Sequence, residues 1–282
     1  MLNPLKAYRD QRVLLASKHA KERVIAPAFY QALGCQVIAA DFDTDQFGTF
    51  SGEVPRPANP YDTCVLKAKA AAAQTDYQWV IASEGSFGPH PSNPFAAFSH
   101  EIMVFVDLQH DWTIAEHVAT SNTNYMMMDV EPGTDITPFL NAAQFPSHGL
   151  VLQVQGTGLV LAKGITDADL LLSLMEQGFS EAGSLRLSTD MRAMMNPTRM
   201  QVLHTLALKL TQRILTPCAS CHAPGFGFVA TAGQLPCALC GALTSMPQYD
   251  VWGCVACTHK EQRSRADQVL QADPAYCQFC NP

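Results

Sequence analysis

Short apolar runs alternate with longer amphipathic segments along the first three quarters of the chain. Six of these runs predict strands, because runs of this length that are bounded by polar or turn residues are typical of buried strands. The runs cover residues 12–16, 36–40, 79–82, 102–106, 150–154 and 158–162.

Amphipathic segments between these runs predict helices. Asn59 and Pro60 form an N-cap and a first helical position, and the helix they begin extends to about residue 74. Other helices are expected at residues 24–33, where Gly34 supplies a C-cap, and at 167–179 and 197–214, whereas 115–145 reads mainly as connection. Strands and helices that alternate at this spacing predict an α/β fold.

From Thr216 onward the apolar periodicity gives way to Cys, Pro and Gly. We therefore expect an α/β domain at residues 1–215 and a small Cys-rich domain at 216–282. The net charge of −7 over 282 residues argues against a generally basic nucleic-acid binder. The sequence has no apolar run of about 18 residues and no signal-peptide core at its start, so we expect a cytoplasmic protein without a membrane partner.

The Cys-rich segment carries the strongest chemical signal of the sequence. Four C-x-x-C pairs favour metal binding over disulfides or redox chemistry, because a redox motif usually occurs once. Four thiolates complete a tetrahedral zinc site, so the segment predicts two structural zinc ions. The expected ligands are Cys218, Cys221, Cys237, Cys240, Cys254, Cys257, Cys277 and Cys280.

Two pairings of these cysteines fit the spacing. The segment from Cys237 to Cys257 resembles a zinc ribbon, in which the second and third pairs share one ion and the outer pairs close a second site. Sequential pairing of neighbouring C-x-x-C turns is the alternative.

In the α/β segment, WVIASEGSFGPHP raises the question of a lone carboxylate. The apolar run at 79–82 stops at Ser83-Glu84-Gly85, so we expect Glu84 to lie in a glycine-rich loop at the end of a strand. In α/β sheets, ligands bind outside the carboxyl ends of the strands. Lysines and carboxylates from several such loops would suit a Mg²⁺-bound phosphate. The candidate catalytic residues are Glu84, Asp62 and Lys21, and the candidate substrate-binding residues are Lys18, His19, Glu53, Arg56, Lys67, Ser86, Arg192 and Arg199.

A family resemblance rests on the segments LLASKHAKERVIAPAFYQALGCQVI and NPYDTCVLKAKAAAAQTDYQWVIASEGSFG. They resemble the pyrophosphatases that act on inosine and xanthosine triphosphates and, more distantly, the Maf-type pyrophosphatases. The resemblance implies a mixed sheet flanked by helices. It also implies that Lys21 binds phosphate, that Asp62 and Lys67 form an acidic and basic helix pair, and that Glu84 binds metal. This chain has Lys18 and His19 near the family's first-turn Asn, and a single Glu84 instead of an acidic pair.

The whole chain, including TDMRAMMNPTRM and YCQFCNP, also resembles an uncharacterised bacterial family with a Cys-rich C-terminus.

Two functional hypotheses follow. The first is a Mg²⁺-dependent hydrolase of a nucleotide or another phosphorylated small molecule, with a structural di-zinc tail. The second is a zinc-ribbon binding module that recognises nucleic acid or a protein while the α/β domain is not catalytic; few basic residues lie near the cysteines, which weakens the nucleic-acid version. The sequence leaves homodimer formation open.

Overall fold

The structure is a computed structural model that describes residues 7–39, 42–49 and 52–281. The chain divides into two compact units. The larger one, called here the α/β unit, spans residues 9–211, and the smaller one, called the Cys-rich unit, contains residues 212–281. No helix within the described ranges is long and apolar enough to cross a membrane.

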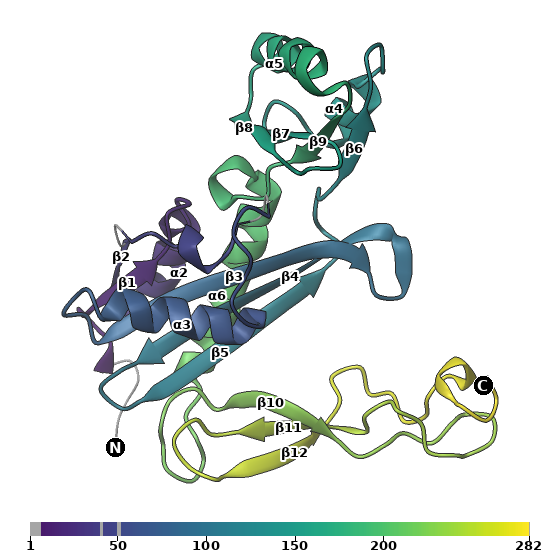
Figure 1. The fold of residues 1–282 in the computed structure, drawn as a ribbon. Coiled ribbons are helices and arrows are strands. Elements are labelled where there is room, and N and C mark those ends of the chain that lie inside the picture. The colour runs from purple at the N-terminus through teal and green to yellow at the C-terminus, as the bar shows by residue number, and fades with distance from the viewer. Residues whose placement is uncertain (1–6, 40–41, 50–51, 282) are drawn as a thin grey trace. The chain divides into compact units, whose positions relative to one another are not determined.

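A mixed sheet forms the base of the α/β unit (Figure 1). Its strand order is β2-β1-β3-β4-β5, with β1 parallel to both β2 and β3, whereas β3, β4 and β5 are antiparallel. The strands are β1 (Arg12–Ala16), β2 (Gln36–Ala39), β3 (Trp79–His90), β4 (Asn93–Asp107) and β5 (Trp112–Thr120). The predicted α/β class with a mixed sheet is confirmed at this level.

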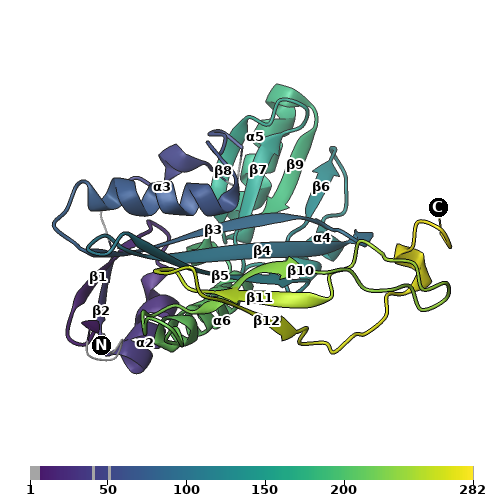
Figure 2. The same cartoon turned by 90° about the horizontal axis from the view of Figure 1, so that it is seen from below.

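Helices cover both faces of this sheet (Figure 2). Helix α3 (Pro60–Ala72) packs on one face, where its alanines meet Leu14, Val80 and Val104. Helices α2 (Glu22–Leu33) and α6 (Pro197–Leu215) lie on the other face, where the ring of Phe29 stacks on Phe105 at 6.2 Å. The N-cap at Asn59 and the C-cap at Gly34, in the left-handed conformation, agree with the sequence.

The expectation that the third strand stops before Glu84 is wrong. β3 continues to His90, because β4 pairs with it beyond the apolar run, with Glu84 opposite Ile102 and Gly85 opposite Glu101. The paired backbone satisfies the hydrogen-bonding groups of the glycines, so the segment needs no turn there. Glu84 therefore projects from the middle of a strand.

A second sheet completes the α/β unit. Its order is β6-β9-β7-β8, and all neighbours are antiparallel. The strands are β6 (Met127–Val130), β7 (Leu150–Val154), β8 (Val160–Ile165) and β9 (Leu185–Thr189), packed with α4 (Thr137–Ala142) and α5 (Ala168–Ala182). The segment 115–145, expected to be mainly connection, thus contains the end of β5, strand β6 and helix α4. Its Met126 and Met128 flank a core of Leu, Ile and Val from both layers.

The Cys-rich unit contains an antiparallel sheet of β10 (Gly227–Ala232), β11 (Tyr249–Gly253) and β12 (Lys260–Ser264). Little apolar core supports it. The guanidinium of Arg263 lies 3.9 Å from the ring centroid of Trp252, and the ring of Phe226 lies 6.2 Å from Trp252. Short 3₁₀ turns complete the chain at η1 (Asp45–Phe47), η2 (Ala193–Met195) and η3 (Pro274–Tyr276).

Candidate functional site

The eight tail cysteines form two sets of four. Cys218, Cys221, Cys254 and Cys257 make one set, and Cys237, Cys240, Cys277 and Cys280 make the other; within each set the sulfur atoms lie within 4.8 Å of one another. The first C-x-x-C pair thus joins the third and the second joins the fourth. Both pairings expected from the sequence are wrong, because β10 and β11 bring the first pair beside the third.

Local turns point the two sulfur atoms of each C-x-x-C pair toward the centre of their set. After the first pair His222 has φ of 61°, and after the second Gly241 has φ of 74°, so both residues adopt the left-handed conformation. This turn lets the N–H of His222 reach the carbonyl of Cys218 and the N–H of Gly241 reach that of Cys237, at 2.9 Å each. The same C-x-x-C spacing also turns backbone N–H groups toward the first sulfur of a pair, as for Leu239 N to Cys237 Sγ at 3.4 Å.

Each set fits one tetrahedral metal ion. With metal–sulfur bonds of about 2.3 Å, tetrahedral geometry places the sulfurs about 3.8 Å apart. The sulfurs of Cys218 and Cys257 are 3.8 Å apart, and those of Cys240 and Cys277 are 3.6 Å apart. The backbone N–H of Phe279 lowers the pKa of Cys277 to about 7, whereas the hydrogen bond with Cys240 raises the pKa of Cys280 in the same set to about 12, so metal binding would release protons from this set. The two sets can therefore hold two metal ions.

In the α/β unit, a cluster of buried charges joins α2, α3 and β3. Lys21 donates hydrogen bonds to Ser83 Oγ at 2.9 Å and to Ser83 O at 3.4 Å. Lys67 forms an ion pair with Glu84 Oε1, and Arg56 Nη2 lies 3.4 Å from Glu84 Oε2. Four residues predicted for one site thus lie together, and both oxygens of Glu84 face a cationic side chain.

A second buried ion pair adjoins this cluster. Arg199 Nε lies 2.6 Å from Glu101 Oε1, and both side chains are at most 1% exposed. Arg199 also donates to the carbonyl of Met191. Gly85 makes room for the pair, since a Cβ atom at Gly85 would lie 2.6 Å from Arg199 Nη2. In this structure Arg199 is a buried ion-pair partner and does not line the cavity described next.

Positive charge exceeds negative charge in the combined cluster. Burial, followed by the fields of Lys21, Arg199, Arg192 and Lys67, lowers the pKa of His19 to about 3. Burial, followed by Arg199 and Lys67, also lowers the pKa of Lys21 to about 8, although Glu101 and Glu84 act in the opposite direction. The cluster has four cations against two carboxylates: Lys21, Lys67, Arg56 and Arg199 against Glu84 and Glu101.

A cavity of about 620 Å³ opens within the α/β unit. Its lining includes His19 of the β1–α2 connection, Asp45 of the turn after β2, Lys163 and Arg186 of the second sheet, and Arg192 of the loop after β9. A smaller hollow lined by Lys21, Lys67, Ser83 and Glu84 shares His19 and Asp45 with this cavity. The buried charges therefore adjoin a space large enough for a small molecule.

Asp62, predicted to be catalytic, lies outside this arrangement. It accepts a hydrogen bond from Asn59 Nδ2 at 2.7 Å and its N–H donates to Asn59 Oδ1 at 3.0 Å. Its side chain is exposed and lines neither the cavity nor the hollow. Asp62 is thus part of the N-cap of α3.

The remaining predicted residues form ion pairs or hydrogen bonds, and of these only Arg192 lines the cavity. Lys18 Nζ lies 2.7 Å from Asp43 Oδ1, and Arg192 Nη2 lies 2.6 Å from Asp190 Oδ2. Glu53 forms an ion pair with Lys163 of β8. Ser86 Oγ accepts a hydrogen bond from Arg56 Nη1 at 3.1 Å.

Sequence reasoning missed several residues of the site. Glu101, Asp45, Lys163 and Arg186 come from segments with no motif around them. Glu101 had one signal, since it directly precedes the apolar run at 102–106. Its position opposite Gly85 depends on the register of β3 and β4, which that signal does not reveal.

Taken together, the fold and the cysteine sets define an α/β protein with a metal-binding, Cys-rich tail. Residues 67–282 match the family described as "Domain of unknown function (DUF6671)", and the chain belongs to this family. Among solved structures, protein VC0702 from Vibrio cholerae is similar with a TM-score of 0.35 and 10% identity, covering 73% of this chain and 96% of that one. No curated protein matches the chain.

Proposed function

We propose that the α/β unit binds and hydrolyses a phosphorylated small molecule in its cavity. The cationic excess beside the 620 Å³ cavity carries this proposal, with three buried cations and the partly exposed Arg56 against two buried carboxylates. A buried cationic excess is costly unless an anion compensates it. Burial, followed by the charges of neighbouring cations, lowers the pKa values of His19 and Lys21, and a bound phosphate would offset the part that the cations contribute.

The charged residues that line the small hollow suggest a role for each side chain. Lys21 and Lys67 are its cations and bind phosphate oxygens. Asp45 and Glu84 are its carboxylates, and their hard oxygen atoms would hold Mg²⁺, which supplies charge neutralisation for the phosphate. Arg56 keeps Glu84 in place through its contact with Oε2 and its hydrogen bond to Gly85 O at 2.8 Å.

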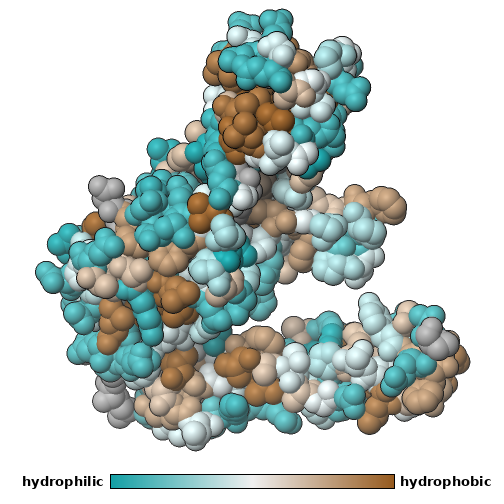
Figure 3. All heavy atoms as spheres, in the orientation of Figure 1, coloured by the Kyte–Doolittle hydropathy of each residue, from teal (hydrophilic) through white to brown (hydrophobic). Residues whose placement is uncertain are grey.

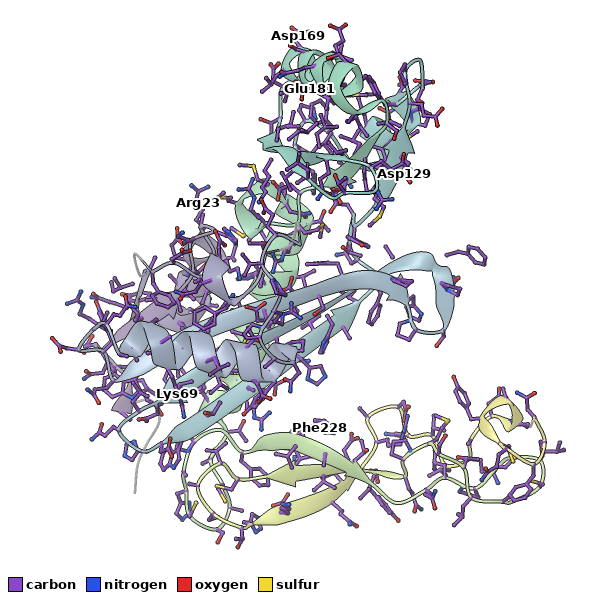
Figure 4. All side chains as sticks on the ribbon, in the orientation of Figure 1. Arg23, Lys69, Asp129, Asp169, Glu181 and Phe228 are labelled. Carbon is purple, nitrogen blue, oxygen red and sulfur yellow. The ribbon has the colours of Figure 1, made fainter. Side chains whose placement is uncertain are left out.

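A matched pair of lysines tests the proposal. Lys67 is buried against Glu84, whereas Lys69, two residues further along α3 and labelled in Figure 4, is exposed. Phosphate and pyrophosphate release should be measured over a panel of phosphorylated metabolites, including nucleoside triphosphates, with and without Mg²⁺. For the best substrate we expect Lys67→Met to lower kcat/KM about 100-fold or more, and Lys69→Met to leave it unchanged. If no compound is hydrolysed and none raises the melting temperature, the proposal is wrong.

We further propose that the tail ions are zinc and that their role is structural. Sets of four thiolates, with no position open for substrate, are typical of structural zinc. The small apolar core of the Cys-rich unit supports the same role, because metal binding supplies folding free energy that burial does not. Elemental analysis of protein purified without added metal should give two zinc ions per chain.

A further inference from the structure

Exposed apolar side chains gather around the second cysteine set. Figure 3 shows hydrophobic side chains at the C-terminal end of the chain. Leu270 is 81% exposed, Leu239 74% and Phe279 72%. Contiguous apolar surface of this kind marks an interaction site more often than scattered single residues do. These three residues, together with Leu243 and Tyr276, are called here the apolar knuckle surface.

The cysteine set holds this surface in shape. Leu239 lies between Cys237 and Cys240, and Phe279 lies between Cys277 and Cys280. The segment that carries Leu270 is hydrogen-bonded to the turn between Cys237 and Cys240, because the N–H of Ala238 donates to the carbonyl of Ala272 at 2.9 Å. A metal ion bound by this set would cross-link the segments that carry the apolar anchors, and this would lower the entropy cost of binding a partner.

A groove adjoins the apolar knuckle surface. Its volume is about 760 Å³, and Leu235, Tyr249, Val269 and Leu270 are among its lining residues. Leu270 belongs to both features, so an extended segment lying in the groove would meet the exposed leucine at its edge.

The charges closest in sequence to the apolar knuckle surface are negative. Residues 235–259 and 266–282 contain Asp250, Asp267 and Asp273 but no Lys or Arg, and the cations of this region, Lys260, Arg263 and Arg265, lie between the two segments. Arg265 lines the groove, but its guanidinium is bound by Asp267 at 2.6 Å and by the carbonyl of Pro247 at 2.9 Å. The hydrogen bonds that Arg265 donates to Asp267, together with the charge of that carboxylate, raise the pKa of Arg265. Four thiolates around one divalent ion would carry a net charge of −2, in addition to the charge of Asp273.

We propose that the apolar knuckle surface and its groove are a docking site for a protein segment that carries apolar anchors flanked by Lys or Arg. The exposed leucines and Phe279 supply the contact area, and the acidic surroundings select a basic partner. Nucleic acid fits poorly, because its phosphates need cations that this surface lacks. The inference is independent of the hydrolase proposal, since it rests on residues of the Cys-rich unit alone.

Synthetic peptides test the proposal on the full-length, zinc-loaded protein. One peptide carries leucines between lysines, a second carries the same leucines between glutamates, and a third keeps the lysines but replaces the leucines with glycine. We expect only the first to bind, and we expect its affinity to fall as salt rises. Leu239→Ser with Phe279→Ser should weaken it at least 10-fold at unchanged zinc content. Phe95→Ser, at a residue 98% exposed in the α/β unit, should not.

Other outcomes would overturn this inference. Equal binding of the glutamate-flanked peptide would refute the charge selection, and equal binding of the glycine peptide would refute the apolar anchors. Binding of single-stranded RNA or DNA that the double variant abolishes would assign the surface to nucleic acid. A dimer in analytical ultracentrifugation that the double variant dissociates would assign it to a second copy of this chain. Absence of binding by all three peptides would also count against the site.

Discussion

Glu84 shows how one carboxylate can serve as a counter-ion to a buried and a partly exposed cation. Its oxygens contact Lys67 and Arg56, and Glu84 and Lys67 are both less than 10% exposed. The buried charge of Lys67 is tolerated because a paired, hydrogen-bonded charge loses less on burial than a lone one. The question that the sequence raised about a lone carboxylate thus has a structural answer, and Mg²⁺ binding by Glu84 is a second role that the hydrolase proposal adds.

Substitution Glu84→Gln separates these roles. Gln keeps the shape but removes the counter-charge, so the free energy of unfolding should fall by about 1.5–3 kcal/mol in urea denaturation. Without Mg²⁺, pyrophosphate should bind more tightly to the variant, because one negative charge has left the cluster. With Mg²⁺, the metal-dependent gain in pyrophosphate affinity should shrink. Unchanged stability would show that the ion pair with Lys67 contributes nothing.

Lys21 should make anion binding depend on pH. Its neighbours in the cluster are Ser83, Glu84, Lys67, Arg199 and Glu101, and its pKa in the folded protein is about 8 instead of 10.5. As pH rises through 8 the cation is lost, so pyrophosphate affinity should fall between pH 7 and 9 in calorimetric titration. Lys21→Met should bind weakly throughout and lose this step.

The same pKa shift predicts the pH dependence of stability. Between pH 8 and 10.5 the unfolded chain binds more protons at Lys21 than the folded chain does, so this group makes folding more favourable as pH rises across that window. Lys21→Met should remove that contribution from a series of urea unfolding curves. A wild-type curve and a variant curve of equal slope would contradict the assignment.

At the scale of elements, the long β3–β4 pair decides where the site lies. Helices α2, α3, α5 and α6, the caps at Asn59 and Gly34, and the starts of β1, β2, β3 and β7 follow from local pattern, because periodicity and capping are local properties. The continuation of β3 through Gly85 does not follow from local pattern. Two glycines and two prolines within a few residues predict a turn, and only the cross-strand partners in β4 show that the segment is a strand. Glu101 lies opposite Gly85 because of the register in which β3 pairs with β4. That register depends on contacts between residues that are far apart in the sequence.

Two glycines of β3 give a matched test of this explanation. At Gly85 a new Cβ would lie 2.6 Å from Arg199 Nη2 and 2.7 Å from Glu101 Oε1, whereas at Gly88 it would meet nothing within 4 Å. Gly85→Ala should therefore lower the free energy of unfolding by about 1–3 kcal/mol, because it overpacks a buried ion pair. Gly88→Ala should be neutral or slightly stabilising. Equal effects in urea denaturation would mean that the space at Gly85 is not needed for the pair.

At the scale of the whole molecule, the sequence indicates a Cys-rich tail and the number of thiolate sets, but not their membership. C-x-x-C spacing fixes which two sulfurs share a turn, whereas the choice between turns depends on how β10, β11 and the following loops fold back. Three pairings of four turns are equally compatible with that spacing. The structure selects the one in which the first turn joins the third.

Double substitutions distinguish the three pairings by zinc content. Cys221→Ser with Cys254→Ser damages one set in the observed arrangement, so one zinc ion per chain should remain; the ribbon and sequential pairings both predict none. Cys221→Ser with Cys240→Ser damages both observed sets, so no tightly bound zinc should remain, although sequential pairing would leave one ion. Native mass spectrometry and elemental analysis of both variants give the counts. Because each ion contributes folding free energy to its own loops, the first variant should also keep the fold around Cys277 and Cys280, while the second should lose the tail structure at both sets.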